Sequence, residues 1–137
     1  MKELRSRTAS MKEDFWLMGE VIHGEYGRWV NGEMLHSVTN YELHKALYSG
    51  HNDHNYFEIA HNVKRLESVG RALYTFTDNH DEDRIASKLR EPDHLFPVYQ
   101  LLFTLPDPVR VLRKRMGDPG ARTRESDEAL RPALSLK

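Results

Sequence analysis

The fold class can be predicted from one segment near the middle of the chain, ALYTFTDNHD at residues 72–81. Its first six residues are apolar, aromatic or β-branched, and its last four are acid, amide, imidazole and acid. An apolar run of this length predicts a buried strand of a parallel sheet. The polar residues 78–81 then lie at the edge of the sheet where its parallel strands end, which we call the C-terminal edge.

A segment far upstream, FWLMGE at residues 15–20, has the same design, because a short apolar run ends in one carboxylate, Glu20. Residues 35–41 could form another strand that runs on into a helix, and apolar residues recur at helical spacing at residues 57–66. Strands that alternate with helices predict an α/β fold with a parallel sheet. Two strands that deliver carboxylates to one edge meet the physical requirement for cleaving a glycosidic bond.

Further helices are expected at residues 2–10, 82–89 and 95–105. The last has an apolar face in the sequence pattern, formed by Phe96, Tyr99, Leu102 and Phe103. A chain of 137 residues is long enough for one ordinary domain with a core of its own.

The composition excludes several classes of function. A net charge of -1 gives no overall field that would attract nucleic acid or anionic lipid. The absence of cysteine excludes disulfides and thiolate metal sites. No apolar run has the length of a membrane span or the form of a signal-peptide core. We therefore expect a soluble, cytoplasmic protein with no nucleic-acid or membrane partner.

The two polar groups at the predicted edge have both a structural and a functional interpretation. Glu20, taken alone, is typical of a solvated loop residue. Held against apolar neighbours, its carboxyl would retain a proton and act as a general acid. Residues 78–81 could form a capped turn, but a turn needs one such residue and not four in a row. We favour function, with Asp81 stabilising charge and His80 binding a substrate hydroxyl.

Two other clusters have less support as sites. His51, Asp53, His54 and His61 suggest a metal site, but their spacing lacks the close pairing of a helical zinc site, and a polar loop explains them better. We expect no metal and no cofactor. The basic run at residues 110–124 has no interleaved aromatic residue for base stacking, and a solvated basic tail is the ordinary explanation.

Three segments carry a resemblance to a known family. GEVIH at residues 19–23, SVTNY at residues 37–41 and FTDNHD at residues 76–81, followed by Arg84, are similar to the fifth-, sixth- and seventh-strand motifs of the α-amylase superfamily, glycoside hydrolase family 13. Within that family the chain looks most like neopullulanase and cyclomaltodextrinase. Ile22 departs from the pattern, because that subgroup often has Trp at this position.

The resemblance implies a partial (β/α)₈ barrel that covers roughly strands five to seven. It implies a fragment of a retaining glycoside hydrolase that acts on α-glucosidic linkages of starch and maltodextrin-type glucans. Glu20 would be the general acid/base, and Asp81 would stabilise the oxocarbenium-like transition state. His80, Asn79 and His23 would bind the substrate, an α-glucan oligosaccharide.

The resemblance also implies that one essential group is missing. Retention needs a carboxylate nucleophile, which in this family is an Asp after strand four, and no segment of this chain corresponds to that strand. A complete barrel of this type takes about 250 residues. We therefore expect this chain alone to be inactive. The alternative is a non-catalytic oligosaccharide-binding or inert remnant, and a complementary N-terminal half-barrel fragment is the expected protein partner.

The chain is predicted to divide at residue 105. Residues 1–105 form the partial catalytic barrel, and residues 106–137 form an irregular basic tail that is expected to be disordered. Reading plausible codons one base later turns residues 107–117 into IPSVYYGSEWG, which looks like the family's eighth strand. We hypothesise that a lost and a regained base scrambled this strand, which sequencing of the coding DNA would test.

Overall fold

The computed structural model describes residues 1–69, 72–105 and 109–110. Its sheet has four parallel strands in the order β1-β2-β3-β4. The strands are β1 (Met18–Gly19), β2 (Ser37–Thr39), β3 (Leu73–Phe76) and β4 (Val109–Arg110). The expected α/β fold with three parallel strands is therefore confirmed.

β4 was not predicted. Its two residues pair with Thr75 and Phe76 of β3, although the sequence around them lacks the apolar pattern of a strand. A short strand can form there because the pairing uses backbone groups, which every residue except proline supplies in full. Val109 and Arg110 belong to the tail that was expected to be disordered, so that expectation was wrong for these two residues; the rest of residues 106–137 lies outside the described part of the chain.

The helices follow the predicted positions closely. They are α1 (Lys2–Met11), α2 (Tyr41–Asn52), α3 (Tyr56–Val69), α4 (Ile85–Lys88) and α5 (Leu95–Thr104), with 3-10 turns at Tyr26–Arg28 and Pro92–His94. The Asn40 side chain caps α2 by accepting a hydrogen bond from the Leu43 amide at 3.2 Å. This cap fixes the start of α2 directly after β2.

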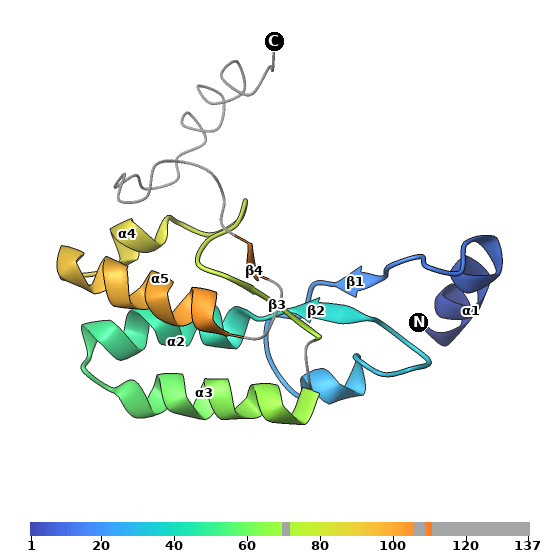
Figure 1. Cartoon of the computed structure of the whole chain (residues 1–137), viewed down its shortest axis with the longest axis horizontal. Coiled ribbons are helices and arrows are strands. Elements are labelled where there is room, and N and C mark those ends of the chain that lie inside the picture. The colour runs from blue at the N-terminus through green and yellow to red at the C-terminus, as the bar shows by residue number, and fades with distance from the viewer. Residues whose placement is uncertain (70–71, 106–108, 111–137) are drawn as a thin grey trace, which may run out of the picture.

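The core lies where the sheet meets α2, α3 and α5, which run side by side in Figure 1. Where α2 and α3 meet, Gly50 allows a close approach, because a Cβ atom there would lie only 2.8 Å from Cγ1 of Ile59. The buried apolar side chains of the core include Val38, Leu43, Leu47, Leu73, Ile85, Val98 and Leu102.

The N-terminal segment is far less buried than the rest. α1 buries no residue and lies at the opposite end of the molecule from α3 and α5 (Figure 1). The expectation of a buried first strand was wrong, because Phe15, Trp16 and Met18 are 43%, 59% and 47% exposed. The physical reason is strand order: β1 is at the end of the sheet, and β2 is its one partner among the described residues.

The predicted apolar face of α5 is also partly wrong. Val98, Tyr99 and Leu102 are buried, whereas Phe96 and Phe103 are 75% and 59% exposed. Val98 and Leu102 are one helical turn apart and define the buried stripe, and the two phenylalanines lie beside that stripe. Within the described residues, no helix has both the length and the apolar character needed to cross a lipid bilayer.

Candidate functional site

The C-terminal edge gathers three segments of the chain that are far apart in sequence. Glu20 follows β1 directly, Tyr41 begins α2 just after β2, and residues 78–81 follow β3. Because β1, β2 and β3 are parallel neighbours, their carboxyl ends meet at one side of the sheet. The strand order therefore places Glu20 and residues 78–81 at the same edge, as expected.

A continuous series of hydrogen bonds joins the predicted residues at this edge. The Tyr41 hydroxyl donates to Oε1 of Glu20 at 2.7 Å, and Nδ2 of Asn79 donates to the Tyr41 oxygen at 2.8 Å. The Asp81 amide donates to Oδ1 of Asn79 at 2.9 Å. Every bond runs in the same direction, from Asp81 toward Glu20, so each donor polarises the next. The series fixes Glu20 and the backbone of Asp81 on one framework.

Tyr41 is held as a neutral hydroxyl. Burial and the hydrogen bond to the Glu20 carboxylate, with the nearby charge of Asp81, raise the pKa of Tyr41 to about 12, although the bond from Asn79 acts in the opposite direction. The Tyr41 ring packs edge-on against Phe76, with ring centroids 4.9 Å apart. The phenol is therefore a fixed donor aimed at Glu20 at any ordinary pH.

Asp78 anchors the loop that carries the other polar residues. It is 3% exposed, and its carboxylate accepts hydrogen bonds from Nη1 of Arg84 at 3.0 Å and from the Ile85 amide at 3.4 Å. A buried carboxylate needs such partners, because an unpaired charge in the core is costly. Asp78 therefore has a structural role, and it orients the loop through residues 79–83.

A second contact holds the same loop against α2. The Glu82 carboxylate lies 3.4 Å from Nε2 of His44 and forms an ion pair with Lys88. Burial opposes ionisation of Glu82, but the hydrogen bond and charge of Lys88 hold its pKa below the usual value. Burial and the same lysine lower the pKa of His44, so the imidazole is neutral at neutral pH. We call these three residues the loop latch.

The loop presents its remaining side chains outward. The side chains of His80 and Asp81 are 78% and 58% exposed, and Nε2 of His80 lies 3.2 Å from Oδ2 of Asp81. Glu20 is exposed as well, so apolar neighbours do not enclose its carboxyl, and the solvated position that is typical of such a residue is the one found. The hydroxyl of Tyr41 is its specific neighbour. The catalytic roles of Glu20 and Asp81 stay predictions.

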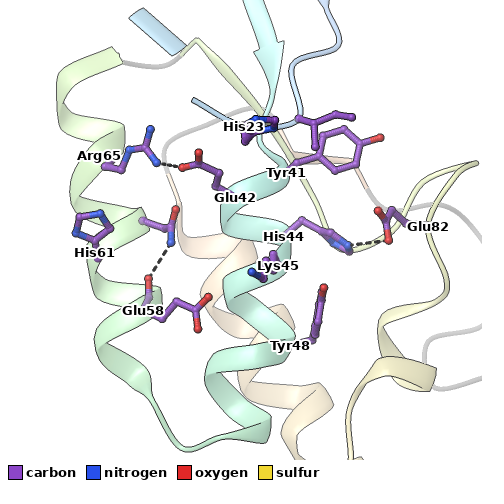
Figure 2. Close-up of a pocket in the computed structure, with 12 residues that line it drawn as sticks. His23, Tyr41, Glu42, His44, Lys45, Tyr48, Glu58, His61, Arg65 and Glu82 are labelled. Atoms are coloured by element: carbon purple, nitrogen blue, oxygen red, sulfur yellow. Dashed lines mark hydrogen bonds and ion pairs between the residues drawn. The ribbon is translucent and has the colours of Figure 1, made fainter. Parts of the chain in front are cut away.

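His23 makes no bond in this hydrogen-bonded series. With Tyr41 it lines a pocket of about 500 Å³ that is bounded by α2, α3 and the loop after β1 (Figure 2). The loop is held by Gly24, whose amide donates to Glu42 at 2.9 Å and whose carbonyl accepts from Arg65 at 2.8 Å. The substrate-binding role predicted for His23 stays a prediction.

Sequence reasoning assigned no role to Tyr41 or to the loop latch. Tyr41 was quoted only as the end of a motif, yet its place one residue after the Asn40 cap puts it at the same edge as Glu20. His44, Glu82 and Lys88 carried no local signal, because the partners that meet are as many as 44 positions apart in sequence.

The histidine cluster does not form a metal site in the structure. The rings of His51 and His94 are 5.3 Å apart, and those of His54 and His94 are 5.8 Å apart. His51 instead bonds through Nδ1 to the Leu47 carbonyl at 2.7 Å. In the described part of the chain, no group of three or more histidine or carboxylate side chains has metal-binding geometry. His61 lies elsewhere, beside the pocket in Figure 2.

Comparison with solved structures identifies the fold. The cyclic α-maltosyl-(1→6)-maltose hydrolase from Arthrobacter globiformis matches 90% of this chain, with a TM-score of 0.72 and 21% identity in its complex with maltose. Its ligand-free form gives a TM-score of 0.76 and 18% identity over the same share. CldA, a cyclomaltodextrin glucanotransferase with a three-domain ABC distribution, matches 89% of the chain with a TM-score of 0.66 and 21% identity.

The chain spans about 30% of the length of each of these structures. No family model and no curated protein matches the sequence. At these identities the likeness shows the fold, which is that of one part of α-amylase-family enzymes. The resemblance predicted from the three motifs is thus confirmed at the level of the fold.

Proposed function

We propose that this chain is a piece of a retaining α-glucan-active enzyme of the α-amylase superfamily, and that it carries the acid/base Glu20 and the charge-stabilising Asp81. The proposal rests on one observation, the hydrogen-bonded series that joins Glu20, Tyr41, Asn79 and Asp81 at the C-terminal edge. The fold likeness to a cyclic α-maltosyl-(1→6)-maltose hydrolase and to a cyclomaltodextrin glucanotransferase supports it.

The chemistry divides between what these residues can supply and what they cannot. Glu20 would protonate the leaving oxygen and later activate water, and Asp81 would stabilise the positive charge that develops on the sugar. The covalent step needs a second carboxylate on the opposite face of the sugar, and the chain has no counterpart of that strand. Positioning and electrostatics remain without the covalent route.

The proposal predicts binding at the edge without turnover. Adding maltotriose to the ¹⁵N-labelled chain should shift the amide signals of Asn79 and Asp81, and Asp81→Asn should weaken that shift. Hydrolysis of maltodextrin by the purified chain should stay at the background rate. Edge amides that do not respond to maltotriose, or release of reducing sugar at enzyme-like rates, would contradict the proposal.

A non-catalytic oligosaccharide-binding role is the second candidate. It is favoured by the exposure of the side chains of His80 and Asp81, which are 78% and 58% accessible on a loop that Asp78 and the loop latch hold in place. If binding is the biological role, restoring the missing half of the barrel should leave the affinity for maltotriose unchanged. A rise in affinity together with turnover would favour the enzyme instead.

We further propose that a complementary polypeptide pairs with β1. This strand has one neighbour among the described residues, and Trp16, just before it, and Met18, its first residue, are 59% and 47% exposed. Unpaired backbone groups and adjoining apolar side chains favour addition of a strand or self-association. Sedimentation and thermal unfolding of the purified chain test this together, because a monomer that unfolds in one sharp cooperative transition would count against a missing partner.

A further inference from the structure

The pocket between α2 and α3 lies beside the C-terminal edge and is distinct from it. Tyr41 belongs to both, because it is one of the residues that line the pocket and its hydroxyl donates to Glu20. Glu20, Asn79 and Asp81 do not line the pocket. Its volume of about 500 Å³ lies within the range of small-molecule sites.

The ionic groups of the pocket balance. Its lining includes three carboxylates, Glu42, Glu58 and Glu82, and two cations, Lys45 and Arg65. Glu42 pairs with Arg65, and Glu82 pairs with Lys88, which lies just outside the lining. With Lys88 included there are three carboxylates and three cations. A pocket with no net charge gives no electrostatic preference for an anion or a cation.

Two of these charged groups are available to a ligand. Within the described residues, the side chains of Lys45 and Glu58 have no hydrogen-bond or ion-pair partner, although their backbone carbonyls accept bonds inside their own helices. Figure 2 shows Lys45 near the centre of the labelled residues, with Glu58 and His61 of α3 on one side and Tyr48 on the other. Donor and acceptor thus face the same space from adjacent helices.

We propose that this pocket binds a neutral saccharide of the α-glucan class. The choice of α-glucan rests on the proposed function. Each sugar hydroxyl both donates and accepts, so one molecule can satisfy the ammonium of Lys45 and the carboxylate of Glu58 together. Hydrogen bonds to ionised groups are the strong kind. The half-buried Tyr48 ring, with Nζ of Lys88 4.6 Å from its centroid, adds apolar surface beside these two groups, whereas Tyr41 is only 9% exposed.

The decisive experiment is a calorimetric titration of the full 137-residue chain with maltotriose. The double substitution Lys45→Ala with Glu58→Ala should weaken binding at the pocket about 10-fold or more, because two charge-assisted hydrogen bonds are lost. Lys64→Ala with Glu67→Ala removes the same residue types from the exposed surface of α3 and should leave the affinity unchanged. Glu58→Gln keeps the side-chain shape and should weaken binding less than the double substitution.

A second pair of substitutions separates this site from the proposed active edge. Glu20→Gln with Asp81→Asn should leave binding at the pocket intact, because neither side chain lines it. If these changes abolish all maltotriose binding, the pocket proposal is overturned while the edge proposal stands. Unchanged binding in the Lys45 and Glu58 variant overturns it too, as does tighter binding of glucose 1-phosphate than of maltotriose.

Discussion

Replacing Tyr41 with Phe tests whether the hydrogen-bonded series at the C-terminal edge stabilises the fold. The substitution keeps the ring and its edge-on contact with Phe76 at 4.9 Å. It removes the bond to Glu20 at 2.7 Å and the bond from Asn79 at 2.8 Å. A bond to a charged group contributes about 1.5–3 kcal/mol and a neutral bond about 0.5–1.5 kcal/mol.

Water reduces the expected loss of stability. Glu20 is exposed, so water can replace the phenol as the partner of its carboxylate, and the half-buried amide of Asn79 is also within reach of water. We therefore expect Tyr41→Phe to lower the free energy of unfolding by about 1–2 kcal/mol. Urea unfolding followed by circular dichroism resolves a change of this size.

The matched control is Tyr48→Phe. Tyr48 lies two helical turns further along α2, and its hydroxyl has no hydrogen-bond partner within the described residues, so the expected change is below about 0.5 kcal/mol. A double-mutant cycle between Tyr41→Phe and Glu20→Ala, which removes the acceptor, should give a coupling energy of about 0.5–1.5 kcal/mol. Equal effects of the two Tyr substitutions, together with strict additivity in the cycle, would refute the series as a stabilising connection.

Three further predictions concern charge and pH. The stabilising contribution of Tyr26 and Tyr41 should be fully present below pH 10 and decline as the pH rises toward 12, because both have raised pKa values of about 12 in the folded chain. Urea unfolding across that interval checks this, and a flat profile between pH 10 and 12 would contradict it. The lowered pKa of Glu82 means that its contribution is present above the unfolded-state value of about 4.5 and is lost as the pH falls through the folded value. Glu82→Gln should therefore flatten the acid limb of the stability profile. Asp78→Asn should cost about 2–4 kcal/mol because it leaves a partly buried arginine without its ion pair, and exposed Asp93→Asn, the control, should change stability by less than about 0.5 kcal/mol.

The sequence was sufficient for the main elements of the fold. The segment that became β3 was recognisable because an apolar run is bounded by polar residues on its carboxyl side. The edge placement of Glu20 and of residues 78–81 follows from the rule that parallel strands end together. That rule depends on the direction and order of the strands and not on side-chain contacts, so the sequence pattern was enough to apply it.

Side-chain partners could not be predicted in the same way. Tyr41 reaches Glu20 and Asn79 only because Val38 of β2 pairs with Gly19 on one side and Leu73 on the other. A shift of one residue in either register would turn side chains to the opposite face. The sequence pattern does not specify these registers.

The prediction that residues 15–18 are buried was wrong for a related reason. Phe15 and Trp16 have the composition of a buried strand, but they precede a strand at the end of the sheet and are 43% and 59% exposed. Apolar composition reports that a segment can be covered, whereas strand order determines whether the described chain covers it. The error therefore marks the surface at which we propose a partner.

The contacts that hold the C-terminal edge in place all come from this chain, which bears on how the proposed function would be divided between two polypeptides. Asp78 and the loop latch fix the loop from within this chain, and Tyr41 fixes Glu20, so none of these contacts needs a residue from a missing strand. The Glu20 carboxylate and the backbone that carries Asp81 can then be held in place before any nucleophile is supplied. If the proposal is correct, a complementary half-barrel would add the covalent step to a half-site that is already arranged, and the spacing of Glu20 and Asp81 would change little when the two halves meet.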